Sequence, residues 1–296
     1  MTPAELDALT ESWITHMQAE RKSPHTIRTY TAGVAAFRRW CVAAGIEPVL
    51  DRATVEKFTA ALLDQGAEAA TALSRQRGVR RFSAWLAAEG EIPDDQLAGM
   101  RPPKLDDKVP AELTTDQVKA MLATCGAKDF HDIRDEAIIR LMTESMVRAG
   151  ELLGMLTTEV DIRGGSALVR RGKGGKGRLV PFGPQTARAL DRYARARRRH
   201  ALAASPQFWL ANRQRVMTYE ALYSALRRRA ERAGFTMHPH MLRATGAIRW
   251  RAAGGSVPGL LTVAGWSSLE MAQRYVKAAE NHLAVDEAHK LNLGDL

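Results

Sequence analysis

The sequence predicts a mainly helical protein of two domains with a small β-sheet in the second, an α+β fold class. Apolar residues recur at helical spacing through most of the chain, and capping signals precede several of these runs. Between residues 159 and 182 the period changes to short runs separated by glycines, which indicates strands. Residues 101–112 (RPPKLDDKVPAE) break every period and carry three prolines, so we expect a linker between domains at 1–100 and 113–296.

Four helices are expected in the first domain. Thr2 begins the first, because Thr-Pro-Ala-Glu has capping-box spacing with Pro at the first helical position. Ser23 begins the second, which ends near Gly45, and the third ends near Gly66. The fourth runs from about residue 67 to 90.

The second domain is expected to alternate helices with one strand region. Three short strands are predicted at residues 160–162, 167–169 and 179–182. Helices are predicted near residues 114–126, 133–146, 184–203, 219–233 and 240–254. Ser256 caps a further short helix, and residues 267–270 (SSLE) cap the last one, which bears Tyr275.

The charge of the chain favours a polyanionic partner. Its 296 residues carry a formal net charge of +10, from 43 Lys and Arg against 33 Asp and Glu. Residues 1–100 carry net −2 and residues 101–296 net +12, so the basic excess lies in the second domain. Because the basic residues are clustered, a merely solubilising charge explains them less well than binding to a polyanion.

Several protein classes are excluded by composition. The chain has no run of about 18 apolar residues and no N-terminal export pattern, so neither a membrane span nor secretion is expected. Cys41 and Cys125 fall in different domains and are interpreted as two reduced, buried thiols of a cytoplasmic protein. No CxxC, HExxH or carboxylate cluster suggests a metal, and no cofactor is expected.

Residues 238–277 (HPHMLRATGAIRWRAAGGSVPGLLTVAGWSSLEMAQRYVK) carry the residue types of a phosphodiester-cleaving site with a phenol nucleophile. A tyrosine hydroxyl titrates near pH ~10, so forming its phenolate at neutral pH costs roughly 4 kcal/mol. Guanidinium groups can stabilise the phenolate and the charge that develops on phosphorus, and a His can accept the phenol proton. His240 and Arg243 lie at i and i+3, on one face of the predicted helix. Trp266 offers one N–H donor and Tyr275 the phenol.

Taken singly, these residues have more ordinary interpretations: a cap or filler for the His, core for the Trp, a packed ring for the Tyr. Their joint order, together with a second motif upstream, favours the catalytic interpretation. That motif is Arg148-Ala149-Gly150-Glu151, followed by the basic stretch GKGGKGR at residues 172–178.

With these motifs the chain resembles the tyrosine recombinases of the phage integrase family. The family pattern maps onto Arg148, Glu151, Lys173, His240, Arg243, Trp266 and Tyr275. The resemblance implies a C-terminal catalytic domain and an N-terminal four-helix SAM-like core-binding domain, which together form a C-shaped clamp. The first domain's stretches SPHTIRTY, FRRW and RQRGVRRFSAWL support it. The chain looks like a simple form without the extra domain that larger integrases use to bind arm-type sites.

The resemblance also implies roles for these residues. Tyr275 would attack the scissile phosphate and form a 3′-phosphotyrosine, while Arg148 and Arg243 hold the non-bridging oxygens. His240 would assist transfer of the phenol proton, and Trp266 would support the phosphate. Glu151 would orient Arg148, the alternative being a surface ion pair worth little.

The hairpin supplies the remaining proton donor in this scheme. Lys173 would protonate the leaving 5′ oxygen, with Lys176 as the alternative because both lie among flexible glycines. A plain basic turn that contacts phosphate is the ordinary interpretation of this stretch.

Basic residues elsewhere are expected to contact phosphates, with a solvated helix face as the alternative. In the first domain they fall on the second and fourth helices: Arg21, Lys22, Arg28, Arg38, Arg39, Arg75, Arg77, Arg80 and Arg81. In the second domain they are Lys176, Arg178, Arg195, Arg197, Arg198, Arg199, Arg227, Arg228 and Arg229.

The implied partners are double-stranded DNA attachment sites and further copies of the chain, two per site and four in synapsis, in the host cytoplasm at the nucleoid. The tail after Tyr275 would dock on a neighbouring protomer or fold back on its own domain. Ala244 and Trp266 stand where many relatives have His, which favours a phage or mobile-element integrase over a Xer-type chromosome-dimer resolvase. A type IB topoisomerase-like enzyme with the same chemistry is one alternative. A non-catalytic DNA-binding regulator is another, although the intact set of motif residues speaks against it.

Overall fold

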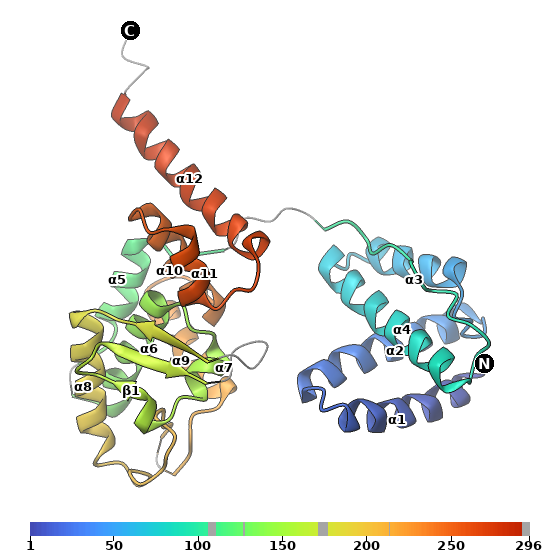
Figure 1. Ribbon diagram of the computed structural model, residues 1–296, viewed down its shortest axis with the longest axis horizontal. Helices are drawn as coiled ribbons and strands as arrows, with labels where there is room; N and C mark the ends of the chain where they lie inside the picture. Colours follow the sequence, from blue (N-terminus) through green and yellow to red (C-terminus); the bar gives the residue numbers. More distant parts are fainter. Residues whose placement is uncertain (106–110, 127, 171–176, 213, 292–296) are drawn as a thin grey trace. The chain divides into compact units, whose positions relative to one another are not determined.

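The computed structural model describes residues 1–105, 111–126, 128–170, 177–212 and 214–291. The chain divides into two compact units, Met1–Lys108 (unit 1) and Val109–Leu296 (unit 2). Helices dominate both units, and unit 2 also holds a three-stranded sheet (Figure 1), which confirms the predicted α+β class. Among the described residues, no helix combines the length and the apolar character needed to cross a bilayer.

Within residues 1–105, unit 1 contains four helices: α1 (Pro3–Ala19), α2 (Pro24–Ala44), α3 (Arg52–Asp64) and α4 (Ala69–Glu89). Thr2 forms the expected capping box with Glu5, and Ser23 caps α2. Their apolar faces meet in one core that includes Trp13, Phe37, Phe58 and Phe82.

Helices α2 and α4 cross at a pair of glycines, Gly33 and Gly78. A Cβ on Gly33 would lie 2.6 Å from the carbonyl oxygen of Arg75, and one on Gly78 would lie 2.5 Å from that of Tyr30. Both distances are too short for real atoms, so the crossing requires the absence of a side chain at these positions. Helix propensity alone disfavours Gly inside a helix, and only the crossing accounts for the pair.

We therefore expect Gly78→Ala to destabilise unit 1, although Ala is the better helix former by about 1 kcal/mol. The added methyl group would press on backbone atoms, which cannot move aside as a flexible side chain can. Overpacking of this kind typically costs about 1–3 kcal/mol. Chemical denaturation checks this, with Ala84→Gly at an exposed site of α4 as the control for propensity. Stabilisation by Gly78→Ala would show that the helices can separate without cost.

Unit 2 contains a 3₁₀ turn (Thr157–Glu159) and the helices α5 (Thr115–Ala123), α6 (Phe130–Ser145), α7 (Ala149–Leu153), α8 (Pro184–Arg197), α9 (Tyr219–Arg232), α10 (Pro239–Ala252), α11 (Val257–Ala264) and α12 (Leu269–Leu291). The strands β1 (Val160–Asp161), β2 (Ser166–Val169) and β3 (Arg178–Pro181) form an antiparallel sheet in that order.

Helix α8 ends at Arg197 rather than near residue 203 as the periodicity predicted. The buried Arg197 guanidinium donates to the carbonyl oxygens of Ala203, Ser205, Gln207 and Phe208, and these bonds hold the following residues in turns. The expectation that Arg197 contacts phosphate is therefore wrong.

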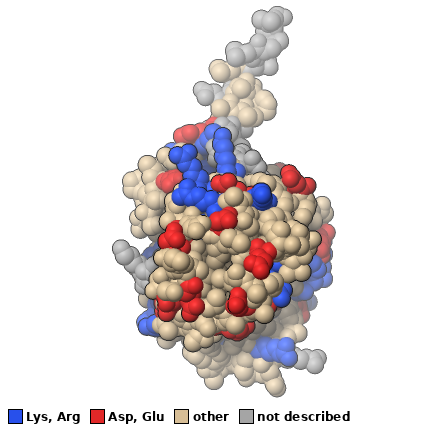
Figure 2. Space-filling view, turned by 90° about the vertical axis from the view of Figure 1, so that its right-hand side faces the viewer, with Lys and Arg blue, Asp and Glu red and all other residues tan. Residues whose placement is uncertain are grey.

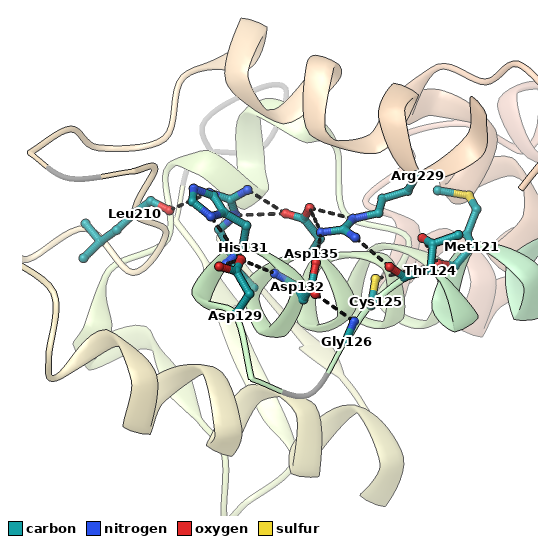
Figure 3. Close-up of polar contacts among 11 residues, drawn as sticks. Met121, Thr124, Cys125, Gly126, Asp129, His131, Asp132, Asp135, Leu210 and Arg229 are labelled. Atoms are coloured by element: carbon teal, nitrogen blue, oxygen red, sulfur yellow. Dashed lines mark hydrogen bonds and ion pairs between the residues drawn. The ribbon is translucent and has the colours of Figure 1, made fainter. Parts of the chain in front are cut away.

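A buried network of charges joins α5, α6 and α9 (Figure 3). The Arg229 guanidinium donates to Asp135 Oδ2 at 2.9 Å, to Asp132 Oδ1 at 2.6 Å and to the carbonyl oxygen of Thr124 at 2.7 Å. Arg134 donates to the other oxygen of Asp135 through Nε and Nη2. Because Arg229 is buried and fully engaged, the expectation that it contacts phosphate is also wrong.

The two cysteines lie in different units and are free thiols. Cys41 is buried as expected, whereas Cys125, beside the Arg229 network, is only half-buried (Figure 3). Burial raises the pKa of each thiol to about 11, so both stay protonated at neutral pH.

Replacing Arg229 by Ala is expected to destabilise unit 2 by about 3 kcal/mol, because Asp132 loses its arginine and the buried Asp135 keeps only Arg134. Thermal or urea denaturation measures the change. Arg228→Ala, one residue away at an exposed position, is the matched control and is expected to stay within about 0.5 kcal/mol of the parent. Similar losses for the two variants would contradict the structural role of Arg229.

Candidate active site

Helix α10 carries His240 and Arg243 against the C-terminal end of α6. Gly246 permits this approach, because a Cβ there would collide with the carbonyl oxygen of Thr143 and lie 2.8 Å from Met146 Cγ. Met146 ends α6 in the left-handed conformation (φ 55°), and its carbonyl oxygen accepts a hydrogen bond from Arg243 Nη1. Packing of α10 on α6 therefore places Arg243 close to the start of the Arg148 motif.

Arg243 is 1% exposed and holds together the segments around it. Its Nη2 donates to the carbonyl oxygen of Ala264 at 2.7 Å, and its guanidinium carbon lies 5.1 Å from the centroid of the Trp266 ring. Burial, with repulsion from Arg148, lowers the pKa of Arg243 to about 10, so it remains charged at neutral pH. Since its hydrogen-bond partners are neutral carbonyls, its positive charge can attract an anion.

Arg148 is held by Glu151, as the spacing predicted. The Arg148 backbone N–H donates to Glu151 Oε2 at 2.9 Å, and Nη1 donates to Oε1 at 2.7 Å. Nη2 lies 3.4 Å from the carbonyl oxygen of Gly265, which brings Arg148 to the Gly-Trp turn. The Glu151 side chain is 4% exposed, so the alternative of a surface ion pair is wrong.

Tyr275 meets His240 and Trp266 in this same region. The tyrosine is 8% exposed, and its hydroxyl oxygen lies 3.1 Å from His240 Nε2. Its ring stacks on Trp266, with centroids 4.7 Å apart and planes inclined by 16°. Trp266 thus contacts both the Arg243 guanidinium and the Tyr275 ring, a structural contribution beyond the phosphate contact expected from sequence.

Local electrostatics favour the neutral form of His240. Partial burial lowers the pKa of His240, and the neighbouring Arg243, His238 and Arg148 lower it further, so the ring is neutral at pH 7. Burial raises the pKa of Tyr275 despite the opposing effect of Arg243, Arg274 and Arg148. A protonated phenol thus faces a neutral imidazole, the starting arrangement for general base catalysis.

Two family descriptions match this chain. The N-terminal SAM-like domain of phage integrases matches residues 10–90, and the phage integrase family matches residues 111–282, more than half of the chain. The chain belongs to the phage integrase family. By this membership the protein is a tyrosine recombinase, an enzyme class that cleaves and rejoins DNA strands.

The phage integrase relatives include Xer proteins. Tyrosine recombinase XerC of Xanthomonas campestris pv. campestris (strain B100) is 30% identical, over 94% of this chain and 87% of the relative. Tyrosine recombinase XerD of Mycobacterium leprae (strain TN) is 29% identical, over 93% of this chain and 94% of the relative.

Solved structures support the integrase fold. XerH site-specific recombinase bound to palindromic difH substrate has a TM-score of 0.75 at 16% identity, covering 97% of this chain and 84% of that chain. A lambda integrase dimer bound to a COC′ core site has a TM-score of 0.70 at 17% identity, covering 91% and 94%. At these identities the likeness bears on the fold alone.

The candidate proton donors of this integrase-family chain, Lys173 and Lys176, lie outside the described residues. Arg178, expected to contact DNA, does not fit that role. Its side chain is 10% exposed, and its guanidinium donates to both oxygens of Glu151 and to the carbonyl oxygen of Val263. No local pattern indicates this burial, because an Arg that follows a basic turn resembles its neighbours.

The basic residues of unit 1 that are expected to contact DNA divide between two depressions and other sites on its surface. Arg28 and Arg75 line a shallow depression between α2 and α4, whereas Arg77, Arg80 and Arg81 line another beside residues 95–98. Arg38 instead pairs with Asp7 at 2.8 Å, while Arg21, Lys22 and Arg39 are exposed. On the face drawn in Figure 2, the largest group of Lys and Arg side chains lies toward the top, and Asp and Glu are spread over the rest.

In the DNA-free protein, the pKa of His240 is expected to lie below its ordinary value of 6.5, because partial burial and the charges of Arg243 and Arg148 disfavour the imidazolium. NMR of the ring protons against pH measures the midpoint, and His240→Gln identifies the signal. Removing one of those charges in Arg148→Gln should raise the midpoint. A midpoint at or above 6.5 in the parent would mean that the neighbouring arginines do not disfavour the imidazolium.

Proposed function

We propose that this protein is a site-specific recombinase that exchanges DNA strands through a 3′-phosphotyrosine on Tyr275. One observation carries the proposal: the Tyr275 hydroxyl lies 3.1 Å from a neutral His240, beside two arginines brought in from distant segments. A buried phenol paired with an imidazole alone would suit a structural contact. The added guanidinium groups suit a phosphate, whose charge they would neutralise.

The proposed chemistry assigns a role to each of these groups. Tyr275 Oη attacks phosphorus while its proton passes to His240 Nε2, and the bond from phosphorus to the 5′ oxygen breaks. Arg148 and Arg243 stabilise the charge on the non-bridging oxygens, and Trp266 supports the phosphate. Lys173, or Lys176 in its place, protonates the leaving oxygen. Because the phosphotyrosine conserves the bond energy, the 5′ hydroxyl of a partner strand can reverse the step without ATP.

The proposed partner is double-stranded DNA carrying a short core site, bound by two copies of the chain, with four copies in synapsis. Solved relatives support this stoichiometry, since they include a lambda integrase dimer bound to a core site and a lambda integrase tetramer bound to a Holliday junction. The exposed Val285 and Leu291 on α12, which projects from the body of unit 2 (Figure 1), would let the tail dock on a neighbouring protomer.

The proposed biological role is integration or excision of phage or mobile-element DNA. Ala244 is fully buried among apolar residues where many relatives have His, and Trp266 replaces the second His. The names of the relatives favour a second candidate, a Xer-type resolvase of chromosome dimers.

One experiment tests both candidates. The protein is incubated with a nicked library of fragments from its host genome and from resident mobile elements, and the covalently attached DNA is sequenced. Recovery of the junctions of a mobile element supports the integrase role, and recovery of one chromosomal site supports the Xer-type role. Attachment without sequence preference would indicate a topoisomerase-like enzyme. Binding without attachment would indicate a non-catalytic regulator.

A further inference from the structure

Arg178 occupies the centre of the network behind the candidate active site. It opens β3, and all three nitrogens of its guanidinium are engaged. Nη1 and Nη2 donate to Glu151 Oε1 and Oε2 at 3.0 and 2.7 Å, and Nε donates to the carbonyl oxygen of Val263 at 2.8 Å. This is the bidentate geometry in which an arginine holds a carboxylate most firmly.

Glu151 is shared equally between Arg178 and Arg148. Oε1 accepts from Nη1 of each arginine, and Oε2 accepts from Arg178 Nη2 and from the Arg148 backbone N–H. Burial opposes ionisation of Glu151, but the hydrogen bonds of Arg178 and Arg148 outweigh it and lower the pKa of the carboxyl to about 2. The carboxylate that holds Arg148 is thus itself held by Arg178.

The turn at Gly265 is shaped to admit this guanidinium. Gly265 has φ 63°, and a Cβ there would lie 2.8 Å from Arg178 Cζ and Nη1. The carbonyl oxygen of the same glycine receives Arg148 Nη2 at 3.4 Å. Arg178 therefore lies where three parts of the site meet: α7 with Arg148, strand β3, and the turn that presents Trp266.

We propose that Arg178 is a positioning residue for the strand-cleavage reaction, acting through Glu151 to hold the Arg148 guanidinium where the scissile phosphate binds. The proposal rests on the proposed function of the site. Arg178 contacts no DNA in this role, since its nitrogens are already engaged. A lysine at this position would keep the positive charge but could not donate two parallel hydrogen bonds to the Glu151 carboxylate. Arg178 therefore acts through its hydrogen-bonding geometry rather than through its charge.

The test uses the full-length protein and a nicked attachment-site substrate that traps the covalent adduct. Single-turnover cleavage is measured with protein in saturating excess, below the melting temperature of every variant. DNA affinity is measured separately in the Tyr275→Phe background at several salt concentrations. Arg178→Gln should slow saturated cleavage about 10²-fold, the size of effect expected from a displacement of about 1 Å. Affinity and its salt dependence should remain unchanged.

A double-mutant cycle with Glu151→Gln separates positioning from other roles. If Arg178 acts through the Glu151 carboxylate, Arg178→Gln slows cleavage by less than about threefold once Glu151 is already Gln. The same 10²-fold loss in both backgrounds would overturn the proposal. The proposal would also fail if Arg178→Gln reduced the salt dependence of DNA affinity by about one phosphate contact, because such a reduction marks direct DNA binding.

A conservative variant keeps the test decisive if Arg178→Gln folds poorly. Arg178→Lys retains the charge and is expected to slow cleavage while DNA affinity stays unchanged. In the Glu151→Gln background, Arg178→Lys should not slow cleavage further. Parental cleavage rates in Arg178→Lys would overturn the proposal. Failure of the parent protein to form any adduct would instead contradict the proposed function, which makes the two failures distinguishable.

Discussion

Tyr275→Phe is expected to form no covalent adduct with DNA and to bind its site with unchanged affinity. The substitution removes only the hydroxyl, which is the proposed nucleophile, and leaves the ring to stack on Trp266. The lost hydrogen bond to His240 is worth about 0.5–1.5 kcal/mol, so the fold should remain intact. Adduct formation is measured on denaturing gels with a nicked suicide substrate, and affinity by gel shift.

Tyr219→Phe is the matched control for this prediction. Tyr219 is 51% exposed at the start of α9, away from the residues that meet around His240. It should form adduct at the parental rate. Any adduct trapped by Tyr275→Phe would show that another group attacks the phosphate, and the assignment of the nucleophile would fail.

Arg148→Ala is expected to slow cleavage about 10²–10³-fold while weakening DNA binding far less. A donor aimed at charge that develops in the transition state is worth about 3–4 kcal/mol in rate, whereas one phosphate contact is a modest share of an interface with many. Because Arg178 still pairs with Glu151 in this variant, the carboxylate is not left alone and the fold should survive. Single-turnover cleavage and equilibrium binding separate the two effects.

Arg188→Ala, at an exposed position of α8, serves as the control for general loss of positive charge. Its cleavage rate at saturating protein should match that of the parent. If Arg148→Ala lost affinity and cleavage in equal proportion, Arg148 would be a binding residue rather than part of the transition-state clamp.

Local signals were sufficient to predict most elements. Thr2, Ser23, Thr114 and Ser256 each accept a hydrogen bond from the backbone of the helix they precede, as expected from sequence. Caps depend on residues three positions apart, so no distant part of the chain is needed to find them. The same holds for the hairpin signals between residues 159 and 182.

The candidate catalytic set was also available from sequence, because its members are recognised by order and spacing. The pairing of Arg148 with Glu151 follows from the spacing of three residues, and the structure places both beside the Gly-Trp turn. The contact between Tyr275 and His240 does not follow from spacing. It depends on α12 packing against α10, which no local pattern specifies.

The sequence by itself determined most of the helices, the strands, the two-domain organisation and the residue types of the site, because each has a local or ordered signature. Only the tertiary structure decided which arginines face solvent. Arg178, Arg197 and Arg229 sit in basic stretches like their neighbours, yet each is buried among carboxylates or carbonyls. The physical reason is that the environment of a charge depends on groups brought from distant segments, and Gly33, Gly78 and Gly246 control how closely those segments approach.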